Sequence, residues 1–179
     1  MSRAGTLRTT VVPLAALLLT AACTSEGADP NAPLPRTAKD DALRWAQKRT
    51  ASMAEIAGVE LTASTAKAHF ENCVGADDEV AEDGRYSLFY YVDSPAPVTD
   101  HTRVVRTLRL ELGRQGYEVT GYREFKDTYT SAVFRANDEK THYRVTAETV
   151  GSGGTKPQAL SFAVRTPCML PPGAKQQQF

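Results

Sequence analysis

The spacing of apolar and small side chains predicts a first amphipathic helix over residues 38–57. Thr37 and Asp40 have the spacing of a capping box at its start, and Gly58 provides a stop signal at its end. One face repeats every three or four positions and should pack against the rest of the domain. That face consists of Leu43, Ala46, Thr50, Met53 and Ala57, with Ile56 beside them.

A second amphipathic helix is predicted after Pro95 and Pro97. Thr99 or Asp100 can cap its start, and the helix should end at Gly116. Its apolar face is expected to cover a sheet, because the side chains on that face lie along one stripe. The stripe consists of Val104, Val105, Leu108 and Leu112.

Alternation with a period of two predicts the strands. Residues 86–92 alternate apolar and polar positions, and four later segments are rich in aromatic and β-branched residues. Brief alternation at 59–63 and 66–70 indicates short strands as well. The four later segments are 117–125, 128–136, 141–150 and 159–166, and their short connections predict antiparallel hairpins.

The order of these elements predicts the fold class. Helix, short strand, strand, helix and four successive strands are most simply buried as an α+β domain. We expect an antiparallel sheet of about five strands with helices packed on one face, a two-layer sandwich. This single α+β domain should span residues 37–170, and the polar segment 171–179 should be a disordered tail.

The N-terminus has the pattern of an export signal. Arg3 and Arg8 precede an apolar stretch that Pro13 interrupts and that is too short for a membrane-spanning helix. The run Leu19-Thr20-Ala21-Ala22-Cys23 follows it and resembles the lipobox of bacterial lipoproteins. The resemblance implies cleavage after residue 22, attachment of diacylglycerol to Cys23, and a protein anchored on the extracytoplasmic face of the cell membrane. The alternative is an ordinary signal peptide with an incidental cysteine.

Removal of the 1–22 leader changes the length and the charge only slightly. The remaining 157 residues suit one domain, and they carry 19 basic and 21 acidic side chains, a balance of −2. A nucleic-acid partner is therefore not expected, and we expect a monomer. Residues 23–36 are rich in proline and predict a flexible tether between the lipidated cysteine and the domain.

Two cysteines remain if Cys23 is lipidated. We expect Cys73 and Cys168 to form a disulfide, because an extracytoplasmic compartment does not keep thiols reduced. A metal or redox site is the alternative, but the chain has no CxxC motif. The lipobox, the tether and this pair of cysteines together resemble small lipoproteins of actinobacteria. That resemblance implies location and architecture but no activity.

Catalytic and metal motifs are weak along the whole chain. Ser64-Thr65-Ala66-Lys67 has the S-x-x-K form of penicillin-interacting serine enzymes, but no S-D-N or K-T-G triplet accompanies it. We expect this segment to be an exposed loop or an edge strand. We also expect surface histidines at His69, His101 and His142, a solvated acidic loop at 77–84, a flexible hairpin at 151–154, and neither a metal nor a cofactor.

Two groups of side chains are candidates for a binding surface. The basic group on the outward side of the second helix consists of Arg103, Arg106 and Arg114, with Arg109 at its flank. The aromatic group, expected on the sheet face away from the helices, consists of Phe89, Tyr91, Tyr122 and Tyr129. The preferred hypothesis is a noncatalytic binding or accessory domain that engages an envelope protein, peptide or lipid. The alternative is a small extracytoplasmic hydrolase with a spatially assembled site.

Overall fold

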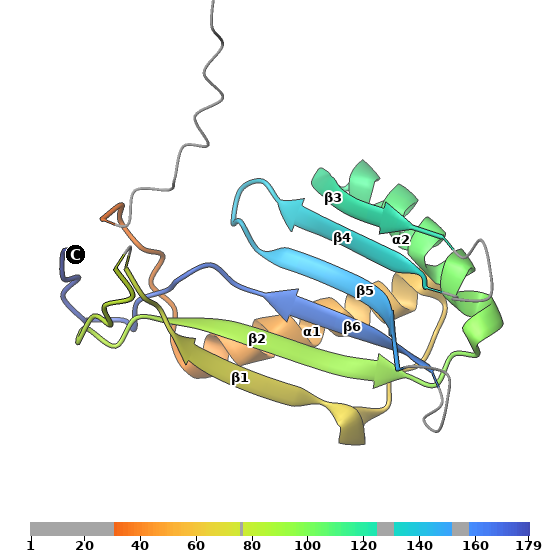
Figure 1. Ribbon diagram of the computed structural model, residues 1–179, viewed down its shortest axis with the longest axis horizontal. Helices are drawn as coiled ribbons and strands as arrows, with labels where there is room; N and C mark the ends of the chain where they lie inside the picture. The colour runs from red at the N-terminus through yellow and green to blue at the C-terminus, as the bar shows by residue number, and fades with distance from the viewer. Residues whose placement is uncertain (1–30, 76, 125–130, 152–157) are drawn as a thin grey trace, which may run out of the picture.

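The protein is an α+β domain built on a six-stranded antiparallel open sheet (Figure 1). The computed structural model describes residues 31–75, 77–124, 131–151 and 158–179. The order of strands across the sheet is β1-β2-β6-β5-β4-β3. The elements are α1 (Lys39–Ala57), β1 (Lys67–Asn72), β2 (Tyr86–Ser94), α2 (His101–Arg114), β3 (Tyr117–Arg123), β4 (Val133–Asp138), β5 (Arg144–Val150) and β6 (Ala159–Arg165). Cys23 and the leader lie outside the described residues.

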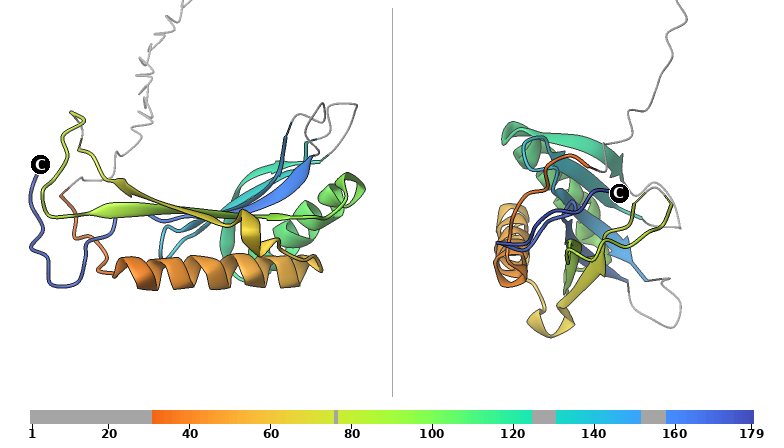
Figure 2. Two further views of the ribbon diagram at one scale, coloured as in Figure 1. Left: turned by 90° about the horizontal axis from the view of Figure 1, so that it is seen from below. Right: turned by 90° about the vertical axis from the view of Figure 1, so that its left-hand side faces the viewer.

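Both helices pack against the same face of the sheet, which confirms the predicted layers (Figure 2). Alternate side chains of each central strand meet the helices there and are fully buried. In α2, all four side chains of the predicted apolar stripe have no exposed surface. The core between the layers includes Leu88, Phe134, Phe162, Leu108 and Met53.

The predicted caps of the helices are wrong, whereas the predicted stops are correct. The N-cap position of α1 is Ala38, and no side chain caps this helix. Thr37 serves the tertiary structure instead, because its N–H donates to the Leu170 carbonyl at 3.0 Å and its carbonyl accepts from Tyr86 Oη at 2.7 Å. Gly58 ends α1 in the left-handed conformation, with a φ of 66°.

The start of α2 also lacks the expected cap. A short 3₁₀ helix, Val98–Asp100, leads directly into α2, and Asp100 has a right-handed helical backbone and makes no capping bond with its side chain. Gly116, with a φ of 88°, follows the end of the helix as predicted.

The strands follow the prediction, with differences at 59–63 and at the ends of several strands. The short alternation at 66–70 belongs to β1, which is an exposed edge strand, but 59–63 contains no strand. The β5 strand begins three residues later than expected. Asp138 Oδ1 accepts the N–H groups of Lys140 and Thr141 at 2.9 and 3.3 Å, so the backbone turns there before β5 starts.

The two chain ends of the described region pack against each other, contrary to the expectation for the tail 171–179 and for residues 31–36 of the predicted tether 23–36. The Leu34 N–H donates to Gln176 Oε1 at 3.0 Å, and the Phe179 N–H donates to Asn31 Oδ1 at 2.8 Å. Gln177 is held by Asp83, which accepts its N–H at 2.9 Å. Residues 31–36 and 171–179 therefore extend the folded unit beyond the 37–170 range predicted from the sequence.

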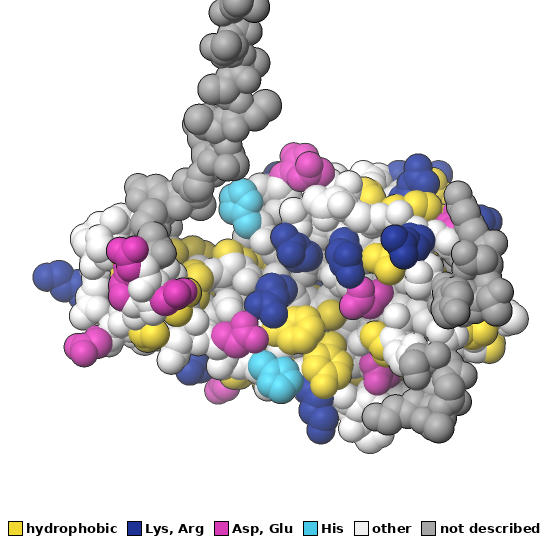
Figure 3. Space-filling view, in the orientation of Figure 1, with side chains coloured by type: hydrophobic (Ala, Val, Ile, Leu, Met, Phe, Trp, Pro, Cys, Tyr) yellow, Lys and Arg dark blue, Asp and Glu magenta, His cyan; other side chains and the backbone are white. Residues whose placement is uncertain are grey.

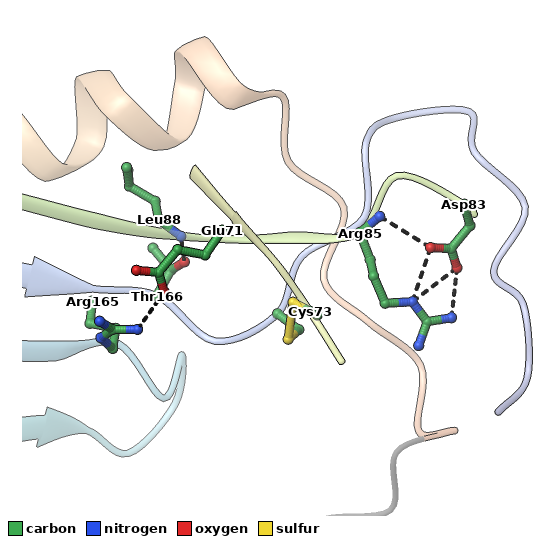
Figure 4. The surroundings of a disulfide bond; sticks show 8 residues. Glu71, Cys73, Asp83, Arg85, Leu88, Arg165 and Thr166 are labelled. Carbon is green, nitrogen blue, oxygen red and sulfur yellow. Dashed lines mark hydrogen bonds and ion pairs between the residues drawn. A yellow bond between two sulfur atoms is a disulfide. The ribbon is translucent and has the colours of Figure 1, made fainter. Parts of the chain in front are cut away.

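The disulfide between Cys73 and Cys168 is formed, with a Cα–Cα distance of 6.1 Å (Figure 4). It joins the segment after β1 to the segment after β6, 95 residues apart in the sequence. Backbone bonds continue the connection, since Tyr86 and Met169 exchange N–H···O bonds of 2.9 and 2.7 Å. This end of the sheet is therefore fixed covalently as well as by hydrogen bonds.

A buried ion pair lies in the predicted acidic loop, beside the disulfide (Figure 4). Asp83 is almost fully buried and accepts two bonds from Arg85 Nε at 3.0 and 3.1 Å and one from Arg85 Nη2 at 2.6 Å. The expectation of a wholly solvated loop is therefore wrong for this residue. Arg85 also donates to the Gln177 carbonyl, and its guanidinium lies 4.3 Å from the centre of the Phe179 ring.

Neither helix in the described part of the chain combines the length and the apolar character needed to cross a bilayer.

Candidate binding face

The sheet has one face that the helices leave uncovered, which we call the open face (Figure 3). Hydrophobic side chains gather near its middle, with basic and acidic side chains around them. The period of two places alternate residues of β1, β2, β6, β5 and β4 on this face. It is the face on which the sequence predicted aromatic side chains.

Three rings on the open face form what we call the ring cluster, which consists of His69, Phe89 and Tyr91. The Phe89 and Tyr91 rings have centroids 5.6 Å apart, and His69 lies 6.4 and 6.1 Å from them. His69 is opposite Phe89 in the register of β1 and β2 and is exposed, as expected. No local pattern in the sequence groups His69 with the rings, because the pairing of β1 with β2 creates this contact.

A hollow of about 260 Å³ lies beside the ring cluster. Its floor is formed by two small residues of β6, Ser161 and Ala163. The rings of Phe89 and Tyr91 stand on one side of this floor, since β2 is the neighbour of β6. The other lining residues are Asp93, Glu148 and Val150. A central strand with small residues between strands with large ones therefore produces the depression.

The sequence prediction found Phe89 and Tyr91 but missed the rest of the hollow. The signal was the alternation of the small Ser161 and Ala163 with the larger Leu160, Phe162 and Val164 along β6. This pattern indicates a hollow only when the strand order is known, with β6 between β2 and β5. No local pattern in the sequence specifies that order.

Ion pairs neutralise part of the charge on the open face. Arg165 donates to Glu71 at 2.9 Å and also lies over the Phe89 ring at 4.9 Å. Arg135 Nη2 donates to Glu148 Oε2 at 2.6 Å. These pairs are exposed enough that each contributes little to stability, on the order of 0–1 kcal/mol. Their effect is to fix the positions of charged groups around the ring cluster and the hollow.

The candidate arginines lie on α2, on the helical side of the molecule, and do not meet the ring cluster. Arg103, Arg106 and Arg114 each have a carboxylate partner. Arg103 lies 3.5 Å from Asp100 and donates to the Ala57 carbonyl at 2.8 Å. Arg114 lies 2.5 Å from Glu111. Arg106 binds Glu124, which follows β3, and Arg109 lies over the ring of Tyr122 in β3.

Tyr122 belongs to the helical side, so its predicted place on the open face is wrong. A β-bulge between Val119 and Gly121 shifts the register by one residue, and this shift exchanges the two sides of the strand beyond it. Tyr122 consequently pairs with the buried Phe134. Tyr129, the fourth aromatic candidate, lies outside the described residues.

Around Tyr122, charged groups form a compact network. The Arg109 guanidinium lies 4.6 Å from the centre of the Tyr122 ring, and the Tyr122 hydroxyl donates to Glu124. Arg106 donates to the two Glu124 oxygens at 3.0 and 2.7 Å. The hydrogen bonds from Arg106, and to a lesser extent that from Tyr122, lower the pKa of Glu124 to about 2. Burial is the main cause that raises the pKa of Tyr122, and its hydrogen bond to Glu124 adds to this effect. The basic group is therefore largely engaged within the protein.

His101 is fully buried, which corrects the expectation of a surface histidine. Its Nε2 lies 3.1 Å from the Ala96 carbonyl, so this nitrogen must carry the proton. The Thr149 hydroxyl can then donate to Nδ1 at 2.9 Å, while it accepts the Ala132 N–H at 3.1 Å. Burial lowers the pKa of His101 and favours this neutral form.

Among the described residues, the S-x-x-K motif and the acidic candidates do not have the geometry that such sites require. Ser64 lies in a 3₁₀ helix, Ala63–Thr65, that ends before Lys67, so the S-x-x-K segment does not form the helical turn that such enzymes use. Within the described ranges, no three side chains of His, Cys, Asp or Glu come together as a group able to hold a metal ion. Residues 152–154 of the predicted glycine hairpin lie outside those ranges.

A second cavity, of about 670 Å³, lies at the end of the sheet that carries the disulfide. The segment before α1, the β4–β5 turn and Phe179 contribute to its walls, and it shares no lining residue with the hollow. Arg85 lies in its wall, where Asp83 and the Gln177 carbonyl already bind it.

No family model, curated protein or solved structure matches this chain. Its function is therefore inferred from the geometry of the described residues.

Proposed function

We propose that this chain is a noncatalytic binding or accessory domain of the cell envelope, anchored to the membrane through a lipid on Cys23. The open face is its binding surface, and an envelope protein or peptide is its partner. The observation that carries this proposal is the ring cluster, three rings on the sheet face that α1 and α2 leave uncovered. Aromatic residues are enriched in protein interfaces, where they contribute much of the binding energy.

The size of the hollow favours a protein or peptide over a carried lipid. Pockets that enclose whole small molecules usually have volumes of about 300–1,000 Å³. At about 260 Å³, the hollow suits one side chain of a larger partner. The mixed charges around it, from Arg165, Glu71 and Arg135, provide hydrogen-bonding groups for a polar interface rim.

The disulfide between Cys73 and Cys168 supports the proposed location. Disulfides persist in oxidising compartments and are rare in the cytosol. This one is compatible with an extracytoplasmic protein, although it does not bear on lipidation.

The lipid anchor has a direct test. Intact-mass analysis of the protein from its native host is expected to show a chain that starts at Cys23 and carries diacylglycerol. The Cys23→Ser variant is expected to lack the lipid and to leave the membrane fraction. An uncut leader, or an unmodified Cys23 thiol in the wild-type protein, contradicts the anchor.

The binding face is tested by site-specific photocrosslinking in the native envelope. A crosslinking amino acid at position 69, in the ring cluster, is expected to give a discrete covalent product with a protein or peptide. The same amino acid at position 110 is the matched control, because Leu110 is an exposed apolar residue on α2. Equal products from both positions, or none from position 69, contradict the proposal.

Removal of two rings should then abolish the product without unfolding the domain. The double variant Phe89→Ala and Tyr91→Ala is expected to reduce crosslinking from position 69 at least about tenfold, because aromatic anchors commonly contribute 2 kcal/mol or more to binding. Both side chains are only partly buried, so the variant should remain folded by circular dichroism. Unchanged crosslinking in a folded variant excludes the ring cluster as the binding site.

A further inference from the structure

Asp93, which lines the hollow, has a carboxylate oxygen without a partner among the described residues. Oδ1 of Asp93 is buried and accepts no hydrogen bond from the described residues. The backbone fixes this residue, because its N–H donates to Thr65 Oγ1 at 2.9 Å and its carbonyl accepts the Thr62 N–H at 2.7 Å. A buried acceptor without a donor destabilises a protein, so a group of this kind suggests a site for a ligand.

The neighbours of Asp93 show why it, and not Glu148, is the carboxylate of the hollow that is available to a ligand. Asp93 is opposite Ser161 in the register of β2 and β6, and Ser161 is opposite Glu148 in the register of β6 and β5. The two carboxylates thus flank one hydroxyl across three adjacent strands. Glu148 is already bound by Arg135 at 2.6 Å. A cation that enters the hollow therefore finds its free acceptor at Asp93.

The walls of the hollow suit a cation with an alkyl chain. Phe89 and Tyr91 supply ring faces, which attract positive charge, and Val150 adds an apolar surface. Long aliphatic stems of basic side chains pack well on such surfaces while the charged group makes its own contacts. An anion in the same place would be repelled by Asp93 and Glu148.

We propose that the hollow binds a primary alkylammonium group, such as the lysine side chain of an envelope protein or peptide. The ammonium donates to Asp93 Oδ1 and the Ser161 hydroxyl, and the alkyl chain lies against the Tyr91 ring. A single buried oxygen suits the compact charge of an ammonium, whereas a guanidinium is best matched by two parallel acceptors. This assignment rests on the proposed function, because it names the group of the partner that the open face recognises.

The test uses n-butylammonium as the probe and the full chain purified in detergent. In ¹H–¹⁵N spectra, saturable shifts are expected at the amides of Asp93, Ser161 and Ala163. Asp93→Asn is expected to weaken binding at least about tenfold, since it removes a charge-assisted hydrogen bond. Glu111→Gln is the matched control, because Glu111 is a carboxylate of α2, on the helical side of the molecule, and does not line the hollow.

A structural role for Asp93 predicts a different result. If its carboxylate is there for a ligand, Asp93→Asn should raise the midpoint of thermal unfolding, because a buried unpaired charge is removed. A lower midpoint contradicts the proposal. So does binding of methylguanidinium or n-butanol as tight as that of n-butylammonium, or an Asp93→Asn variant that binds like the wild type.

Crosslinking separates failure of this inference from failure of the proposed function. If position 69 still captures a partner while n-butylammonium does not bind, the ammonium assignment is wrong and the binding face remains. If Asp93→Asn also reduces that capture, the same carboxylate serves the partner and the probe, as proposed.

Discussion

Loss of the disulfide between Cys73 and Cys168 is expected to lower the free energy of unfolding by about 4–5 kcal/mol. The bond closes a loop with a sequence separation of 95 residues, and a loop of this length restricts the unfolded chain strongly. A single domain typically has only 5–15 kcal/mol of stability, so the effect should be large. The measurement is guanidinium denaturation of the oxidised wild-type chain and of the double variant Cys73→Ala and Cys168→Ala.

Reduction provides the control for this prediction. Wild-type protein treated with dithiothreitol should unfold within about 1 kcal/mol of the double variant, because both lack the same crosslink. Oxidised wild-type protein and the variant with coincident denaturation midpoints would contradict the expected stabilisation.

The layers of the fold could be predicted from the sequence because each depends on local periodicity. The stripe that contains Leu108 and Leu112 defines the buried face of α2, and the alternation from Tyr86 to Val92 defines that of β2. Three successive hairpins leave β3 to β6 in a meander, as their short connections predicted. Period and turn chemistry were sufficient for this level of description.

The binding face could be predicted only in part, because it depends on register. Phe89 and Tyr91 follow an uninterrupted alternation, so their side of the sheet was clear. One extra residue in β3 reversed the side of Tyr122, and the sequence around it has no unambiguous sign of a bulge. The hollow required the order of three strands, and Asp93 and Glu148 are 55 positions apart in the chain.

The remaining differences arise where tertiary contacts replace local rules. Thr37 has the right spacing for a capping box, but its backbone binds the segment that ends at Leu170. His101 resembles a surface residue at the start of a helix, yet Thr149 and Ala96 provide partners for both of its nitrogens in the core. The glutamine-rich tail has the composition of a disordered segment, and Gln177 is nevertheless bound to the buried ion pair.

That ion pair leads to the second large effect. The variant Asp83→Asn is expected to lower the free energy of unfolding by about 3–5 kcal/mol, because it leaves the buried Arg85 guanidinium without a counter-charge. Glu124→Gln is the matched control, since Arg106 Nε and Nη2 likewise donate to the two Glu124 oxygens, at a more exposed site. There the expected loss is much smaller, because solvent screens the charges of an exposed pair. Equal losses in the two variants would contradict the importance of burial.

The lowered pKa of Asp83 also predicts how the difference in unfolding free energy between the wild type and Asp83→Asn depends on pH. The hydrogen bonds from Arg85, partly opposed by burial, hold the pKa of Asp83 well below its usual value. A carboxylate with a lowered pKa in the folded state stabilises fully above its unfolded pKa of about 4, and the contribution is lost as the pH falls toward the folded value. The stability difference between wild type and Asp83→Asn should therefore be constant from pH 7 to about pH 5 and decrease below about pH 4. Urea denaturation across this range measures it, and a difference that grows on acidification would mean that Asp83 is not ionised in the folded protein.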